Sequence, residues 1–184
     1  MKTAAKQQAV STKRMALIGV MAAATCIVAP FSIPIPVSPV PLSLTTLVLY
    51  TAVYVLGTKD AFFSYVIYLL LGFAGLPVFS GFAGGVAKLA GPTGGYLIGF
   101  LFMIPLTGLL FEKAGKSRAR QIAAMALGTL VCYLFGTVWL CLQLELDFAG
   151  GLATGVIPYL PGDTAKIIAA SFIGPAIAKG VKRA

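Results

Sequence analysis

The chain has 184 residues, of which 59% are hydrophobic and only 10% are charged, and its formal net charge is +9. Because soluble domains carry about 25% charged residues, this composition predicts an integral membrane protein and excludes a large soluble domain. The sequence contains no histidine, which excludes His-ligated metals and Ser-His or Cys-His nucleophile pairs. In a chain this apolar, we interpret the positive charge as basic loops beside anionic lipid and expect no nucleic-acid partner.

Six apolar runs follow segment 1–14, which is basic and is expected to form a cytoplasmic tail. Each run predicts a transmembrane helix, since about 20 helical residues cross the hydrocarbon core of a bilayer. The expected helices cover residues 15–29, 42–56, 61–73, 94–111, 121–144 and 163–178. Residues 1–184 are therefore predicted to form a single all-α transmembrane domain of six helices.

Proline and glycine interrupt the helical pattern in three connections. Segment 30–41 is rich in proline, which excludes a helix and predicts an extended or turning connection. Segment 72–95 is rich in glycine, and segment 145–162 ends in prolines and a glycine. Irregular backbone at membrane depth is tolerated only where protein or a water-filled cavity covers it. We therefore expect irregular loops that lie close to a cavity.

The distribution of basic residues predicts that both termini lie in the cytoplasm. With six spans and the N-terminus inside, Lys88 and Lys166 are the two basic residues that do not fall in cytoplasmic segments. The three irregular connections then lie on the outer side. Asp163 and Lys166 lie at the outer end of the sixth helix, and their spacing of three residues puts them on one face. Together these features predict an extracytoplasmic ligand pocket.

The charges of Asp163 and Lys166 allow two interpretations. A charge at the middle of a membrane helix costs roughly 2.5–3.5 kcal/mol, so such residues usually have a function. They form either a mutually neutralising pair that also caps the helix, or a pair that binds a polar ligand, and both interpretations can hold together. In the second case the carboxylate accepts N–H groups of the ligand, and the ammonium binds an acceptor or a carboxylate.

The glycine block between the third and fourth helices is a second candidate for ligand binding. Glycine lets the backbone approach a ligand closely and present its N–H and C=O groups. Phe79, Phe82 and Tyr96 can supply apolar walls. The alternative is a re-entrant turn that serves packing alone.

The first helix carries small residues at the spacing that favours close helix contact. Gly19 and Ala23 are four residues apart, with Ala16, Ala22 and Cys26 nearby. The helix that approaches them belongs either to this chain or to a partner.

No nucleotide, metal or cofactor site is expected. Segment 114–117 resembles the end of a phosphate-binding loop, but Leu110 stands where that pattern needs glycine. The three cysteines, Cys26, Cys132 and Cys141, lie in apolar runs and are interpreted as packing residues.

Four segments together resemble the BioY family. They are VPLSLTT at 40–46, GLPVFSGF at 75–82, GPTGGYLIGF at 91–100, and Pro161-Gly162-Asp163 with Lys166. The resemblance extends from about residue 15 to 178, and the glycine block is its most specific part. Members of this family are biotin-specific substrate-binding (S) components of energy-coupling factor (ECF) transporters. The resemblance implies six transmembrane helices, an outward-facing biotin site, and a partner module of two ATPases and a transmembrane coupling (T) protein.

With this resemblance, roles can be expected for individual residues. Asp163 is expected to accept a ureido N–H of biotin, and Lys166 to bind an acceptor on biotin or to set the carboxylate. The other expected biotin contacts are Tyr96, Ser43, Phe79, Phe82, Ala83, Gly84, Gly85 and Thr93. The expected docking stripe for the coupling protein is Ala16, Gly19 and Ala23.

The predicted function is the capture of biotin from the extracytoplasmic side, as the substrate-specific subunit of an ATP-driven importer in a prokaryotic plasma membrane. The chain is not expected to be an enzyme. One alternative is a stand-alone biotin transporter without ATPase partners. The other is a membrane enzyme that modifies lipids, which the sequence supports poorly because it offers no acid–base or nucleophile constellation.

Overall fold

The computed structural model describes residues 12–115 and 117–183. The expected tail therefore lies outside the described residues up to position 11, as does Lys116. The elements in chain order are α1 (Thr12–Val28), β1 (Ser32–Ile35), β2 (Ser38–Ser43), α2 (Thr45–Leu56), α3 (Thr58–Phe73), α4 (Val86–Ala90), α5 (Gly94–Ala114), α6 (Arg118–Leu144), α7 (Phe148–Gly155), the 3₁₀ helix η1 (Ile157–Tyr159) and α8 (Leu160–Arg183).

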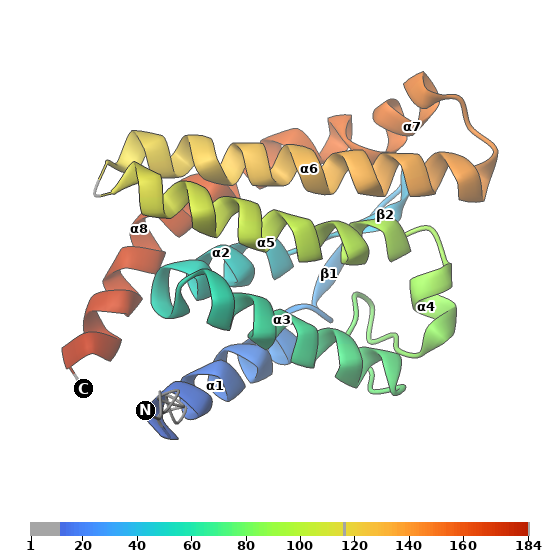
Figure 1. Cartoon of the computed structure of the whole chain (residues 1–184). Coiled ribbons are helices and arrows are strands. Elements are labelled where there is room, and N and C mark those ends of the chain that lie inside the picture. The colour runs from blue at the N-terminus through green and yellow to red at the C-terminus, as the bar shows by residue number, and fades with distance from the viewer. Residues whose placement is uncertain (1–11, 116, 184) are drawn as a thin grey trace, which may run out of the picture.

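The long helices form a bundle in which α5 packs along α6, α2 packs against α8, and α1 packs against α3 (Figure 1). Small residues allow the α5–α6 contact. A side chain added at Gly99 would have its Cβ only 3.0 Å from the Cα of Cys132, and one at Gly136 would overlap the ring of Tyr96. The two helices therefore approach each other along much of their length, which fixes the wall on which the site is built.

Buried tyrosines supply much of the core, and the hydroxyl groups of Tyr50 and Tyr65 are hydrogen-bonded. Tyr50 donates to the Met125 carbonyl at 2.8 Å, and Tyr65 donates to the Leu97 carbonyl at 2.7 Å. A buried hydroxyl without a partner would cost about 1–3 kcal/mol, so these bonds are what make an aromatic polar core tolerable. They also tie α2 to α6 and α3 to α5.

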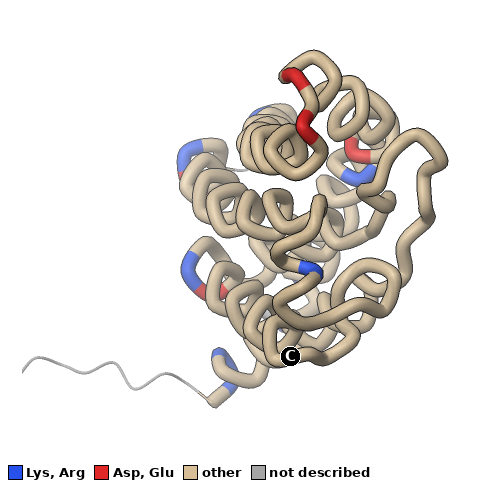
Figure 2. The backbone as a smooth tube through the Cα atoms, turned by 90° about the vertical axis from the view of Figure 1, so that its right-hand side faces the viewer, with Lys and Arg blue, Asp and Glu red and all other residues tan. Residues whose placement is uncertain are grey.

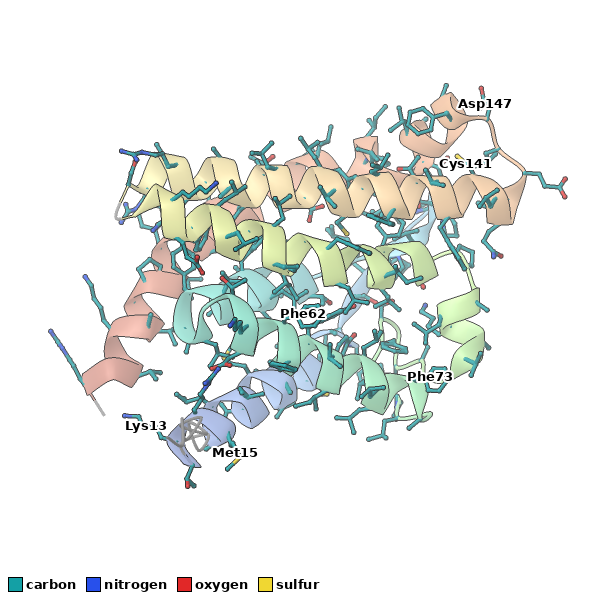
Figure 3. All side chains as sticks on the ribbon, viewed as in Figure 1. Lys13, Met15, Phe62, Phe73, Cys141 and Asp147 are labelled. Carbon is teal, nitrogen blue, oxygen red and sulfur yellow. The ribbon has the colours of Figure 1, made fainter. Side chains whose placement is uncertain are left out.

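The bundle has two chemically different ends. At one end lie the start of α1, the α2–α3 and α5–α6 turns and the end of α8; at the other lie the β-hairpin, α4 and α7 (Figure 1). We call them the basic end and the loop end. Figure 3 places Lys13 and Asp147 at these opposite ends. An end-on view shows that charged positions occupy only a small part of the backbone (Figure 2). The basic end carries, among the described residues, Lys13, Arg14, Lys59, Lys113, Arg118, Arg120, Lys179 and Arg183.

The proline-rich segment is extended, as expected, but it forms two paired strands. The prediction of an all-α chain with irregular outer loops is therefore wrong at this segment. Residues there form an antiparallel hairpin in which Ser32 pairs with Ser43 and Ile33 with Leu42. Prolines exclude a helix but are compatible with the strands of a two-stranded ribbon, because both strands are edges and many N–H groups need no partner. The other two connections contain the short helices α4 and α7.

The helix boundaries also differ from those expected. The second helix starts at Thr45 because the hairpin takes residues up to Ser43, and the last helix runs from Leu160 to Arg183. Within the described residues, three helical stretches are long and apolar enough to cross a membrane: Gly94–Ala114, Arg118–Leu144 and Phe148–Val181. The apolar helix α2 has only 12 residues, which is short for a bilayer core of about 30 Å.

Candidate functional site

A cavity opens at the loop end between β2, the start of α2 and α5, the middle of α6, and the start of α8. The centre of a water-sized sphere can occupy about 90 Å³ of it, several times the roughly 10–15 Å³ that one water molecule needs. It is lined by Val40, Pro41, Leu42, Ser43, Thr45, Thr46, Tyr68, Ser80, Thr93, Tyr96, Leu97, Phe100, Thr129, Cys132, Tyr133, Tyr159, Asp163 and Lys166.

The charged part of the cavity is an ion pair on the first turns of α8. Lys166 Nζ lies 2.8 Å from Asp163 Oδ1, and the two side chains are 9% and 13% exposed. Tyr133 on α6 donates to the other carboxylate oxygen at 2.5 Å. Asp163 also lies in the first turn of α8, where the helix dipole favours a negative charge. Lys166, Tyr133 and the helix dipole therefore all stabilise the negative charge of the Asp163 carboxylate.

This arrangement leaves donors free for a ligand. The Lys166 ammonium has three N–H groups, and Asp163 is the one hydrogen-bond partner that the described residues give it. Each Asp163 oxygen has a second lone pair. The pair can therefore bind an acceptor and a donor of one ligand side by side, without giving up its internal bond.

Hydroxyl groups line the walls near the pair. Ser43 and Thr45 are hydrogen-bonded to each other at 2.9 Å. The Thr93 hydroxyl, at the start of α5, is buried and has no partner among the described residues. The Tyr96 hydroxyl donates to the Gly155 carbonyl at 2.7 Å. Ser43 and Thr93 are therefore better placed than Tyr96 to donate to a ligand, and Tyr96 offers mainly its ring.

Tyr159 holds the hairpin over the cavity. Its hydroxyl group contacts Ser38 Oγ, at 2.7 Å, and the Val40 carbonyl, which both belong to β2. A tyrosine hydroxyl is protonated at neutral pH, so it can donate to the hairpin.

The structure brings together five of the ten expected biotin contacts: Ser43, Thr93, Tyr96, Asp163 and Lys166. The other five come from the glycine block 79–85 and lie outside the lining of the cavity. Phe79 is fully buried and packs edge-on against Tyr68 at 5.6 Å. Phe82 is exposed and packs against Phe31 of the hairpin base at 5.3 Å.

The rest of the glycine block shapes the loop instead of lining the cavity. The Phe79 N–H donates to the Ala83 carbonyl at 2.9 Å, which closes a tight turn and directs Ser80 to the cavity. A Cβ at Gly84 would overlap the Leu76 carbonyl, and Gly85 has a φ of +81°, a region that favours glycine. Backbone geometry therefore explains these residues without a ligand.

Several cavity residues were not expected from the sequence, above all Tyr133 and Tyr159. One signal was present: Thr129, Cys132 and Tyr133 are three and four residues apart in a span without charges, so they share one helix face. A polar face on a membrane helix points to the bundle interior. No comparable signal marks Tyr159, whose contact with β2 joins residues far apart in the sequence.

The expected docking stripe lies on the outer surface of α1. Ala16, Gly19 and Ala23 are all exposed, and a Cβ at Gly19 would have no atom within 4 Å. Ala22 and Thr25 are buried on the opposite face. Within the described residues, the small-residue stripe therefore does not serve packing inside the chain, and its surface is free to receive another helix.

A helical membrane protein with a buried polar cavity at one end of its bundle belongs to the class that binds a small molecule within the membrane. A family model described as the BioY family matches residues 1–183, and the chain belongs to this family. The family is one of transporters, so the chain is a transport protein and not an enzyme.

The comparisons agree in sequence and in structure. The chain is 37% identical over 161 residues to a "Probable biotin transporter BioY" of Pyrococcus horikoshii, covering 88% of this chain and 93% of the relative. It is 38% identical over 141 residues to the "Biotin transporter BioY" of Thermotoga maritima, covering 77% and 82%. The crystal structure of an S-component for biotin from an ECF-type ABC transporter superposes with a TM-score of 0.85 at 29% identity, covering 93% and 95%.

Proposed function

We propose that this chain captures biotin from the extracytoplasmic side, as the substrate-specific membrane subunit of an ATP-driven ECF-type importer. The observation that carries the proposal is the loop-end cavity, in which a buried Asp163–Lys166 pair faces aromatic and aliphatic walls. Biotin has matching parts: a planar ureido head with two N–H donors and a carbonyl, an apolar thioether ring, and a carboxylate on an aliphatic chain. The relatives named as biotin transporters support the same ligand.

In this proposal Asp163 accepts a ureido N–H, and Lys166 donates to the ureido carbonyl or to the carboxylate. Ser43 and Thr93 add polar contacts, while the ring of Tyr96 packs on the apolar part. No cofactor takes part, because binding needs only complementary hydrogen bonds and apolar surface. Phe79, Phe82 and the backbone of Ala83, Gly84 and Gly85 hold the cavity wall in shape from behind.

The proposed membrane arrangement is six spans with both termini in the cytoplasm of a prokaryotic cell and the cavity facing outward. The concentration of Lys and Arg at the basic end supports this orientation. Energy would come from two cytoplasmic ATPases through a coupling protein that docks on Ala16, Gly19 and Ala23. A stand-alone transporter is the second candidate, and uptake of labelled biotin in a host without the coupling module separates the two.

Calorimetric titration of the detergent-purified chain with biotin tests the central claim. We expect saturable binding of one biotin per chain without nucleotide. No measurable binding, or binding only after ATP is added, contradicts the proposal. A comparison of biotin with biotin methyl ester shows which end of biotin Lys166 contacts. If Lys166→Gln weakens the binding of biotin more than the binding of the ester, the ammonium contacts the carboxylate. Equal losses of affinity for both ligands assign the ammonium to the ureido head.

A further inference from the structure

A groove at the basic end, far from the biotin cavity, has a composition that the transport function does not explain. It lies between the last turn of α5 and the first turns of α6. Its polar lining consists of Lys113 and Arg120, and its apolar lining includes Leu110 and Leu127. The groove is therefore a cationic head that continues into an apolar trough.

Neither cation is neutralised by the described residues. Lys113 and Arg120 are exposed and take part in neither of the described ion pairs. The nearby carboxylate of Glu112 is turned to α3, where it accepts a hydrogen bond from Thr58 at 3.0 Å. Arg118, the other described cation of this turn, lies over the ring of Phe172 on α8 at 4.2 Å. The two groove cations are left to face a partner outside the chain.

The start of α6 adds to the positive potential. The first turn of α6 contains no acidic residue, and Ser117 at its N-cap makes no capping bond with its side chain. A helix N-terminus favours anions, yet this one carries Arg118 and Arg120. Basic residues there oppose the helix dipole, and a bound anion would relieve both the dipole and the side-chain charges.

The walls show why a lipid fits better than a soluble anion. Ala114, Ala123 and Ala124 are small, so they leave depth between the two helices. Beyond Leu127 the same two helices expose large apolar side chains, including Leu109 and Leu130. In a membrane protein this surface faces acyl chains, whereas a phosphate ion would gain nothing from it.

We propose that this groove binds one anionic phospholipid, with its phosphate between Lys113 and Arg120 and an acyl chain along Leu110 and Leu127. Basic pockets between helices at the membrane boundary are suited to such headgroups. The proposal is independent of the ligand of the cavity, so biotin binding and lipid binding can fail separately.

Native mass spectrometry of the detergent-purified full chain, titrated with phosphatidylglycerol or phosphatidylcholine, tests the groove. The double variant Lys113→Gln with Arg120→Gln should weaken phosphatidylglycerol binding about 25-fold, since each cation near a membrane surface contributes roughly fivefold. The matched control, Lys59→Gln with Lys179→Gln, removes the same charge from the same end and should change binding less than threefold. Equal losses in both doubles would overturn the proposal in favour of general surface charge.

Two further arms separate the headgroup from the chains. Ala123→Phe fills the trough without changing any charge and should abolish phosphatidylglycerol binding, while a melting temperature equal to that of the parent shows that the variant is folded. Glycerol 3-phosphate, which has the phosphate but no acyl chain, should not compete at millimolar concentration. Competition by that soluble anion, unchanged lipid binding in Ala123→Phe, or no preference over phosphatidylcholine would each overturn the assignment to a lipid.

Discussion

The described residues contain two ion pairs, which lie at opposite ends of the bundle and in different surroundings. Asp163 and Lys166 are both nearly buried, and Tyr133 donates a hydrogen bond to the second carboxylate oxygen of Asp163. In the other pair Arg14 on α1 holds Asp60 on α3 through two contacts of 2.5 Å, but the Arg14 side chain is 46% exposed. The first pair faces a cavity, and the second ties two helices together beside solvent or lipid headgroups.

This difference in burial gives the two ion pairs different roles. A buried pair depends on both members, because removing one leaves a charge without compensation in a low dielectric. In the α1–α3 pair the Asp60 side chain is 10% exposed, but Arg14 is half-exposed and can exchange its contact with Asp60 for water at little cost, since solvent screens the guanidinium. The cavity pair should therefore control ligand affinity, and the α1–α3 pair should control only how α1 is held.

Removing Lys166 should have the largest effect on biotin affinity. Lys166→Ala leaves Asp163 buried without its cation, which costs about 3–5 kcal/mol of folding stability and should lower the melting temperature. It also removes a buried charged group from the binding site, which costs about 2–5 kcal/mol of binding free energy, so biotin binding should weaken roughly thirtyfold or more. Calorimetry and thermal unfolding measure the two effects. The double variant Asp163→Asn with Lys166→Gln is the control: it should recover stability but not affinity. If it binds biotin as the parent does, the pair is only structural.

Removing the Tyr133 hydroxyl should have an intermediate effect. Tyr133→Phe keeps the ring but takes one hydrogen bond from the Asp163 carboxylate, and hydrogen bonds to charged groups contribute about 1.5–3 kcal/mol. We expect biotin affinity to fall roughly tenfold to a hundredfold. Tyr54→Phe removes a tyrosine hydroxyl that bonds Gln121 at 3.0 Å, outside the cavity, and should leave affinity unchanged. Equal losses in both variants would mean that Tyr133 acts through the fold alone.

The docking stripe should affect transport without affecting affinity. Gly19→Trp with Ala23→Trp places bulk on the exposed face of α1, where close backbone approach by another helix is then impossible. ATP-driven uptake and co-purification of the ATPases should be lost, whereas biotin affinity should change by less than about threefold. Loss of biotin binding would place these residues in internal packing. Retained uptake would mean that the coupling protein docks elsewhere.

The α1–α3 pair should have the smallest effect on biotin. Asp60→Asn keeps the shape of the side chain but removes the charge that Arg14 faces. We expect biotin affinity within twofold and a loss of thermal stability smaller than that of Lys166→Ala, because Arg14 can turn to solvent. Calorimetry beside thermal unfolding measures both quantities. A loss of affinity as large as that of Lys166→Ala would remove the distinction between the two ends.

Composition and local spacing were sufficient to predict several features of this chain. The apolar runs predicted the main helices of the bundle, and the positions of Lys and Arg predicted which connections share the basic end. The spacing of Asp163 and Lys166 predicted that they share one helix face, and their 2.8 Å contact confirms it. These features are local because hydrophobicity and helical periodicity act over a few residues.

Several side chains of the cavity are brought together only by the packing of distant segments. Tyr133 reaches Asp163 across 30 positions of sequence, and Tyr159 reaches β2 across more than 100. The glycine block had predicted Phe79 and Phe82 as cavity walls, but the turn it forms buries one and exposes the other. Such contacts depend on how helices pack and how turns close, and no local pattern encodes the pairing of distant surfaces.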